Sequence, residues 1–140
     1  MWTNEYSVET EASPDAIWRL WSDVAGWPEW NADIEHIEIA GPFAAGSTIL
    51  MTPIGQSPIE LRIAEAVEPE RFVDEASFPD LVVRTIHRVE QLGGDRCRVV
   101  YRMEIDGPAA DTVGHELGPH ISADFPETLA ALAQRAERDG

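Results

Sequence analysis

The sequence predicts an α+β fold, in which a curved antiparallel sheet of seven strands wraps around a long C-terminal helix, with two short helices after the first strand. The chain of 140 residues begins with a segment of alternating apolar and polar residues and ends with a long stretch of helical periodicity. Between them, about seventy residues alternate with a period of two and are interrupted by turns rich in Gly and Pro. Strands joined by short turns pair in an antiparallel sheet, whose apolar face the helix has to cover.

The first strand and the two short helices are predicted in the N-terminal part of the chain. Residues 2–11 place apolar side chains on one parity and polar or acidic ones on the other, which is typical of a half-buried strand. In "SPDAIWRLWSDV", Ser13 is a suitable N-cap and Pro14 a suitable first helical residue. A second short helix is expected at about residues 28–32.

Four of the five tryptophans lie in "WRLWSDVAGWPEW", residues 18–30. Trp21 falls in the middle of the apolar arc of the first helix and Trp18 at its border. A binding surface would need several exposed indoles together, which is rare in a monomer. We therefore interpret these residues as packing residues, with Trp27 or Trp30 at a boundary where the indole N–H finds a partner.

Two regions complete the predicted fold. The segments "LVVRTIHRVEQL" and "RCRVVYRMEID" flank "GGD", a strong signal for a β-hairpin. From Val113 to Ala136, apolar residues recur at helical spacing. Because Pro119 and Pro126 each remove a backbone donor, the pattern predicts one long bent helix, or two in line, that ends near residue 138.

Composition limits the class of partner and the compartment. The formal net charge of −16, from 26 acidic and 10 basic residues, repels phosphate backbones and argues against nucleic-acid binding. The single cysteine allows no disulfide within the chain. No basic leader and no apolar run of spanning length is present, so no stable membrane insertion is expected. We expect a single cytoplasmic domain over residues 1–140, as a monomer or homodimer.

These segments resemble the polyketide cyclase/dehydrase branch of the SRPBCC superfamily, which also contains START lipid-transfer domains and the Bet v 1 plant allergens. The resemblance rests on "SPDAIW", on "WPEW" after a helix ending in "SDV", on the "GG" hairpin, and on the Gly-Pro pair within the last helix. It covers nearly the whole chain. It implies a helix-grip fold with a hydrophobic cavity between the sheet and the long helix, and it carries over no catalytic residue.

Candidate site residues come from the inward faces of this fold. Thr85 and His87 share the apolar parity of their strand, and Tyr101 and Met103 that of the partner strand. On the last helix, His120 and Asp124 are four residues apart, so that their side chains can meet. The expected ligand-binding residues are Met51, Thr85, His87, Tyr101, Met103, Leu117, His120 and Ile121, and the catalytic candidates are His87, His120 and Asp124. The alternative is that His87 and Tyr101 are hydrogen-bonded core residues.

Other polar residues are interpreted as structural. "HELGPH" places His115 and His120 five residues apart, which misses the zinc-binding spacing, so no metal site is expected. No nucleotide-binding or nucleophile motif occurs, and no cofactor is expected. Cys97 has inward parity without a predicted basic neighbour, which indicates an inert buried thiol. One of Asp74 and Glu75 must face inward, but we interpret their strand as an edge strand that is wet on both faces.

The sequence therefore predicts the binding of a hydrophobic or aromatic small molecule, similar to a polyketide, lipid or isoprenoid. One alternative is a cofactor-independent cyclase or dehydratase that uses His87, or His120 with Asp124, as acid and base. A second alternative is a protein-interaction domain without a cavity. Small residues at inward positions leave room and favour a cavity; they are Ala64, Ala66, Ala76, Thr85 and Gly114.

Overall fold

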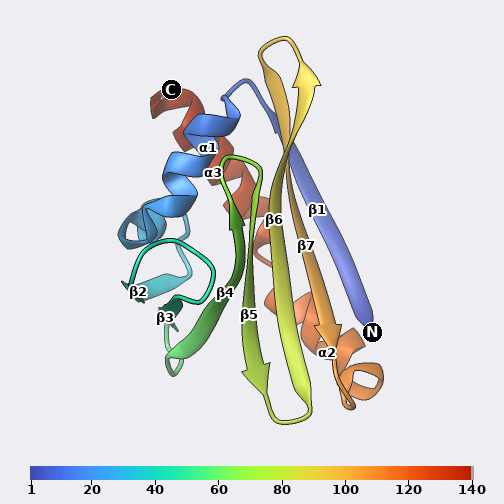
Figure 1. Cartoon of the computed structure of the whole chain (residues 1–140). Coiled ribbons are helices and arrows are strands. Elements are labelled where there is room, and N and C mark those ends of the chain that lie inside the picture. Colours follow the sequence, from blue (N-terminus) through green and yellow to red (C-terminus); the bar gives the residue numbers. More distant parts are fainter. Residues whose placement is uncertain (140) are drawn as a thin grey trace.

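The computed structural model describes residues 1–139 and contains a seven-stranded sheet in the order β1-β7-β6-β5-β4-β3-β2, with every neighbouring pair antiparallel (Figure 1). The strands are β1 (Trp2–Thr10), β2 (Ile34–Ala40), β3 (Thr48–Pro53), β4 (Ile59–Val67), β5 (Arg71–Phe78), β6 (Leu81–Gly93) and β7 (Arg96–Asp106). The helices are α1 (Pro14–Ser22), the 3-10 helix η1 (Val24–Glu29), α2 (Ala110–Ile121) and α3 (Phe125–Asp139). The α+β helix-grip prediction is confirmed.

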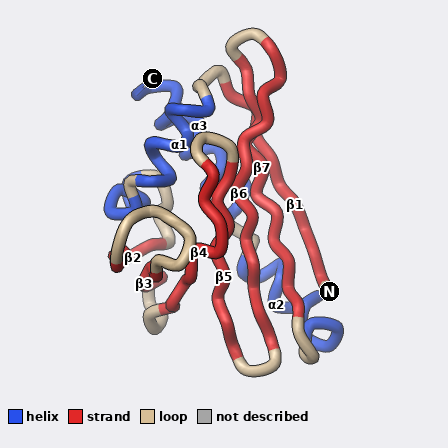
Figure 2. The backbone as a smooth tube through the Cα atoms, in the orientation of Figure 1, coloured by secondary structure: helices blue, strands red, loops and turns tan. Residues whose placement is uncertain are grey.

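The sheet is curved, and β2 and β3 turn away from the direction of the longer strands (Figure 2). Helix α3 packs on β1 and on α1, whereas η1 packs on β2. The helical segments therefore close the space along the inner face of the sheet. None of the described helices has the length and apolar character needed to cross a membrane.

The first helix forms where the sequence predicts it, but the second differs. The Ser13 hydroxyl accepts a hydrogen bond from the Ala16 N–H at 3.1 Å and so caps α1. The second helix covers Val24–Glu29 rather than residues 28–32, because the Gly26 N–H bonds the Asp23 carbonyl and starts a 3-10 turn early. All four tryptophans of this region are buried, which confirms the packing interpretation.

The C-terminal helical region is divided into two helices, as the two prolines allowed. Ser122 stands at the break, where its hydroxyl donates to the Gly118 carbonyl at 2.8 Å and accepts from Asn4 Nδ2 at 2.6 Å. Pro126 occupies the first turn of α3, where its missing N–H costs no helical hydrogen bond. The break is therefore tied to β1 by a side-chain hydrogen bond.

A small second core lies under α2 and meets the main core at Phe125. It contains Leu81, Val83, Met103, Ile105 and Ala110, with Trp2 and Leu117 packed against it. A Cβ atom added to Gly114 would come within 2.8 Å of Trp2 Cβ. The sequence predicts that Gly114 leaves room for a cavity, but Trp2 fills the space beside it.

The outer face of the sheet carries a ladder of arginine–glutamate pairs. Arg84 contacts Glu75 at 2.8 Å and Glu104 at 3.3 Å, and Arg102 contacts Glu104 at 3.0 Å. Each such exposed pair contributes little to stability. The ladder nevertheless shows that the charged parity of β5, β6 and β7 faces away from the core.

Candidate functional site

A cavity of about 220 Å³ lies between the inner face of the sheet, η1 and the start of α3. Most of its walls are apolar or aromatic, formed by Trp27, Trp30, Ile34, Met51, Ile59, Leu61, Phe72, Ala76, Phe78, Val83, Tyr101, Ile121 and Phe125. The polar lining residues are Asn31, Asp74, Thr85, His87, Asp124 and Thr128. Apolar walls with a few polar groups are typical of a small-molecule site.

His87 lies at the centre of the polar part of this wall. Its ring stacks on Phe72, with ring centroids 3.9 Å apart, and Nδ1 is 3.2 Å from the Phe72 carbonyl oxygen. Because a carbonyl only accepts, Nδ1 carries the proton, and Nε2 is left with a lone pair. Burial lowers the pKa of His87 to about 3, against the opposing effect of the Phe72 hydrogen bond. The imidazole is thus neutral at pH 7, which differs from the near-neutral pKa expected of a general base.

Asp74 is the residue that the sequence interpretation missed. Strand β5 is not an edge strand, because it pairs with β4 on one side and β6 on the other. Asp74 faces inward opposite Thr85, is 7% exposed, and places Oδ2 4.0 Å from His87 Nε2. Burial, and secondarily the charge of Glu75, raises its pKa to about 7. This carboxyl group therefore changes its protonation state near neutral pH.

Tyr101 and the tryptophans supply the aromatic wall behind these groups. The Tyr101 hydroxyl accepts a hydrogen bond from Trp21 Nε1 at 3.2 Å, and burial raises the pKa of Tyr101. Trp27 Nε1 donates to the Trp21 carbonyl at 2.9 Å. Trp30 Nε1 is buried and has no hydrogen-bond partner within residues 1–139. Trp27 and Trp30 thus border the cavity, although less than a tenth of each is exposed.

A second carboxyl group, Asp124, contributes to the lining from the connection between α2 and α3. It is half-buried, and Thr128 donates a hydrogen bond to it at 3.4 Å. Burial and the neighbouring Asp33 carboxylate raise the pKa of Asp124 to about 6. The cavity is therefore lined by two carboxyl groups, Asp74 and Asp124, whose pKa values lie well above the ordinary value of an aspartate.

The structure brings together six of the predicted site residues and separates three from them. Met51, Thr85, His87, Tyr101, Ile121 and Asp124 all line the cavity. His120 does not, because it is exposed on the last turn of α2, and the helix ends before Asp124. Their predicted pairing is wrong for this reason. Met103 and Leu117 belong to the small core under α2 and are not among the residues that line the cavity.

The basic residues of the chain contribute nothing to this lining. All ten are arginines, and none of them lines the cavity in the described part of the chain. Within residues 1–139, no group of three or more His, Cys, Asp or Glu side chains is arranged to hold a metal ion. The polar side chains that line the cavity offer carboxyl, imidazole, hydroxyl and carboxamide groups.

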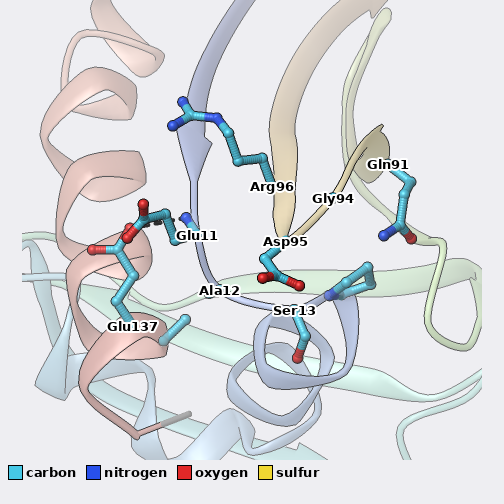
Figure 3. A pocket seen from close by; sticks show the side chains of 10 residues that line it. Glu11, Ala12, Ser13, Gln91, Gly94, Asp95, Arg96 and Glu137 are labelled. Atoms are coloured by element: carbon cyan, nitrogen blue, oxygen red, sulfur yellow. Dashed lines mark hydrogen bonds between the residues drawn. The ribbon is translucent and has the colours of Figure 1, made fainter.

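A second and larger hollow, of about 590 Å³, lies where the β1–α1 connection, the β6–β7 hairpin and the end of α3 meet (Figure 3). Its lining is mainly polar and includes Glu11, Asp95, Arg96 and Glu137. Glu137 Oε2 accepts hydrogen bonds from Thr10 Oγ1 and from the Glu11 N–H, which ties α3 to the β1–α1 connection. The smaller cavity instead combines apolar walls with a few buried polar groups, as small-molecule sites do, and we take it as the candidate site.

Comparison with known proteins identifies the family of this chain. The family model described as "Polyketide cyclase / dehydrase and lipid transport" matches residues 1–137. The chain belongs to this family. No curated protein sequence matches the chain. The structural neighbours have the same helix-grip architecture.

Three solved structures illustrate this relationship. Norcoclaurine synthase from Thalictrum flavum, in complex with dopamine and hydroxybenzaldehyde, is 14% identical with a TM-score of 0.79, covering 99% of this chain and 88% of that chain. A Thermobifida fusca protein solved by NMR is 25% identical with a TM-score of 0.73, over 99% and 95% of the two chains. A START superfamily protein from Mycobacterium smegmatis is 20% identical with a TM-score of 0.71, over 99% of each chain.

Proposed function

We propose that the protein binds a hydrophobic or aromatic small molecule in the cavity between the sheet and α3. The observation that carries this proposal is a wall of aromatic side chains interrupted by Asp74, Thr85 and His87, which are all buried. Apolar walls favour ligand binding through desolvation, and a few polar groups set the ligand's orientation. The family description includes lipid transport, and norcoclaurine synthase holds two small aromatic compounds within the same fold.

The size of the cavity narrows the ligand class. Its volume of about 220 Å³ lies just below the range of roughly 300–1,000 Å³ that is usual for small-molecule pockets. A ligand with one or two rings, or a short polyketide fragment, fits this space better than a full-length lipid does. The cavity favours small-molecule binding over the alternative of an interaction domain without a cavity.

A fluorescent probe tests this proposal. 1-Naphthylamine has only two rings, is neutral at pH 7, and its emission moves to shorter wavelength when it leaves water. We expect saturable binding to the unmodified protein, and at least tenfold weaker binding after Ala76→Leu, which fills the cavity from β5. Ala45→Leu, in the exposed loop before β3, is the matched control. Equal binding by both variants, or no saturable binding at all, would contradict the proposal.

A second candidate function is cofactor-independent acid–base catalysis on the bound molecule, such as cyclisation or dehydration. Asp74 favours it, because a carboxyl group with a pKa of about 7 exchanges a proton readily at neutral pH. In this function Asp74 is the acid or base, and Thr85 and Tyr101 orient the substrate. Once a substrate is known, Asp74→Asn should abolish turnover while binding persists. Full turnover by that variant would eliminate this mechanism.

A further inference from the structure

We infer that the polar end of the ligand is a protonated amine, held between the Asp74 carboxylate and His87 Nε2. The inference rests on the proposed function, because it specifies the chemical class of the molecule that occupies the same cavity. It follows from three features of the cavity: its hydrogen-bond acceptors, its charge and its walls.

The first feature is a pair of acceptors that face each other without a donor between them. Asp74 Oδ2 and His87 Nε2 are 4.0 Å apart, which is too long for a direct hydrogen bond. Nε2 is an acceptor, since Nδ1 already donates to the Phe72 carbonyl. No hydrogen bond to the Asp74 carboxyl group is found within residues 1–139. A group with two or more N–H donors satisfies both acceptors, whereas a carboxylate or ketone places a third acceptor beside them.

The second feature is the sign of the charge. Asp74 and Asp124 both line the cavity, and none of the arginines in residues 1–139 does. The whole chain adds a formal net charge of −16. In a buried site the Coulomb attraction between opposite charges is strong, and the repulsion between like charges is equally strong. The cavity therefore favours a cationic ligand and excludes an anionic one.

The third feature is the aromatic wall around the carboxyl group. Trp27, Trp30, Phe72 and Tyr101 all line the same cavity as Asp74. Aromatic rings attract ammonium groups through their electron-rich faces and also contact an apolar ligand body. A small aromatic or alicyclic amine, with its ammonium group at Asp74, meets both requirements.

Binding of an amine must be linked to the ionisation of Asp74. Its pKa of about 7 means that the carboxylate form, which binds the ammonium group, is the minor form at pH 6 and the major form at pH 8. Amine affinity should therefore rise about tenfold between pH 6 and pH 8, in a range where an aliphatic amine stays protonated.

Three probes with the same naphthalene body separate the possibilities: 2-(1-naphthyl)ethylamine, 2-(1-naphthyl)ethanol and 1-naphthaleneacetate. Isothermal titration calorimetry of the full chain at pH 8 should give the amine an affinity at least tenfold above that of the alcohol, with the acetate weakest. Asp74→Asn should remove the advantage of the amine and leave the alcohol unchanged. Glu60→Gln, which removes an exposed carboxylate from the outer face of the same sheet, should change neither affinity.

The outcomes distinguish this inference from the function on which it rests. If none of the three probes binds, the proposed function itself fails. If the alcohol binds and the amine binds no more tightly, the cavity is functional but the amine assignment is overturned. An amine affinity that stays flat from pH 6 to pH 8 in the unmodified protein overturns it as well, independently of how the Asp74→Asn variant folds.

Discussion

The indole of Trp2 occupies the space that a side chain at Gly118 would need. A Cβ atom at Gly118 would overlap the six-membered ring of Trp2, and one at Gly114 would collide with Trp2 Cβ. The two glycines are four residues apart and thus lie on one face of α2. Together they form the groove that fixes this helix to the first residue of β1.

This groove predicts a coupling in a double-mutant cycle. Gly118→Ala should lower the free energy of unfolding by about 1–3 kcal/mol, because it overpacks a filled site. In a Trp2→Ala background the contact with the indole is gone, and the same substitution should cost at least about 1 kcal/mol less; a small cost remains, because a Cβ before Pro119 disfavours the helical backbone. Urea denaturation of the four proteins measures both values. An equal loss in both backgrounds would show that the groove is not the cause.

The hydrogen bond from Trp21 to Tyr101 predicts an unequal response of the two tyrosines. Tyr101→Phe leaves the buried Trp21 Nε1 without its partner and should cost about 1–3 kcal/mol of unfolding free energy. Tyr6→Phe is the matched control, since no hydrogen bond to the Tyr6 hydroxyl is found within residues 1–139, and should stay within about 0.5 kcal/mol. Chemical denaturation should reveal the difference, and equal costs would contradict it.

Asp74 should make stability fall as the pH rises. Its pKa in the folded protein is about 7 against an ordinary 3.8, so the folded state retains a proton that the unfolded state has lost between these values. The associated stability is complete below about pH 4 and is lost as the pH rises to about 7, up to a limit of about 4 kcal/mol. Asp74→Asn does not titrate and should therefore gain stability over the parent between pH 4 and pH 8.

His87 changes the free energy of unfolding in the opposite direction over nearly the same pH range. Its folded pKa of about 3 lies below the ordinary 6.5, so that its contribution to stability falls as the pH drops from 6.5 to 3. The parent protein should consequently show a flatter pH profile than the Asp74→Asn variant. Thermal or urea unfolding at half-unit pH intervals checks this, and parallel profiles would contradict the assigned pKa of Asp74.

The single cysteine predicts a conformation-dependent reactivity. Cys97 is fully buried, its thiol donates to the Ala12 carbonyl at 3.1 Å, and burial raises its pKa. Because the thiolate is the reactive form, labelling by a disulfide reagent should be roughly a hundredfold or more faster in denaturing urea than in buffer. Complete labelling of the native protein within the mixing time would contradict the buried position.

The sequence pattern predicts the face of the sheet on which a side chain lies, but it does not predict which strands lie beside that side chain. Alternation placed Thr85, His87 and Tyr101 on the inward face because parity depends only on the backbone of each strand. Asp74 has the same kind of parity signal but was assigned to an edge strand. Its burial depends on β5 pairing with both β4 and β6, and this order is a property of the whole sheet.

The helical part of the site was harder for a similar reason. Spacing alone favoured a meeting of His120 and Asp124, and it assumed one continuous helix. The chain instead breaks at Ser122, which Asn4 of β1 holds by a hydrogen bond. Since this contact joins residues that are far apart in the sequence, no local pattern contains it. The protonation of Asp74 and His87 depends likewise on burial in the assembled fold.

The arginine–glutamate ladder on the outer face has a consequence for how this protein can change. Side chains along β5, β6 and β7 alternate between the face that carries the ladder and the face that lines the cavity or the core. Substitutions at Asp74, Thr85 or His87 therefore leave the exterior and its charge pairs untouched. A new ligand preference can evolve, or be engineered, one inward position at a time on a scaffold whose outward surface stays constant.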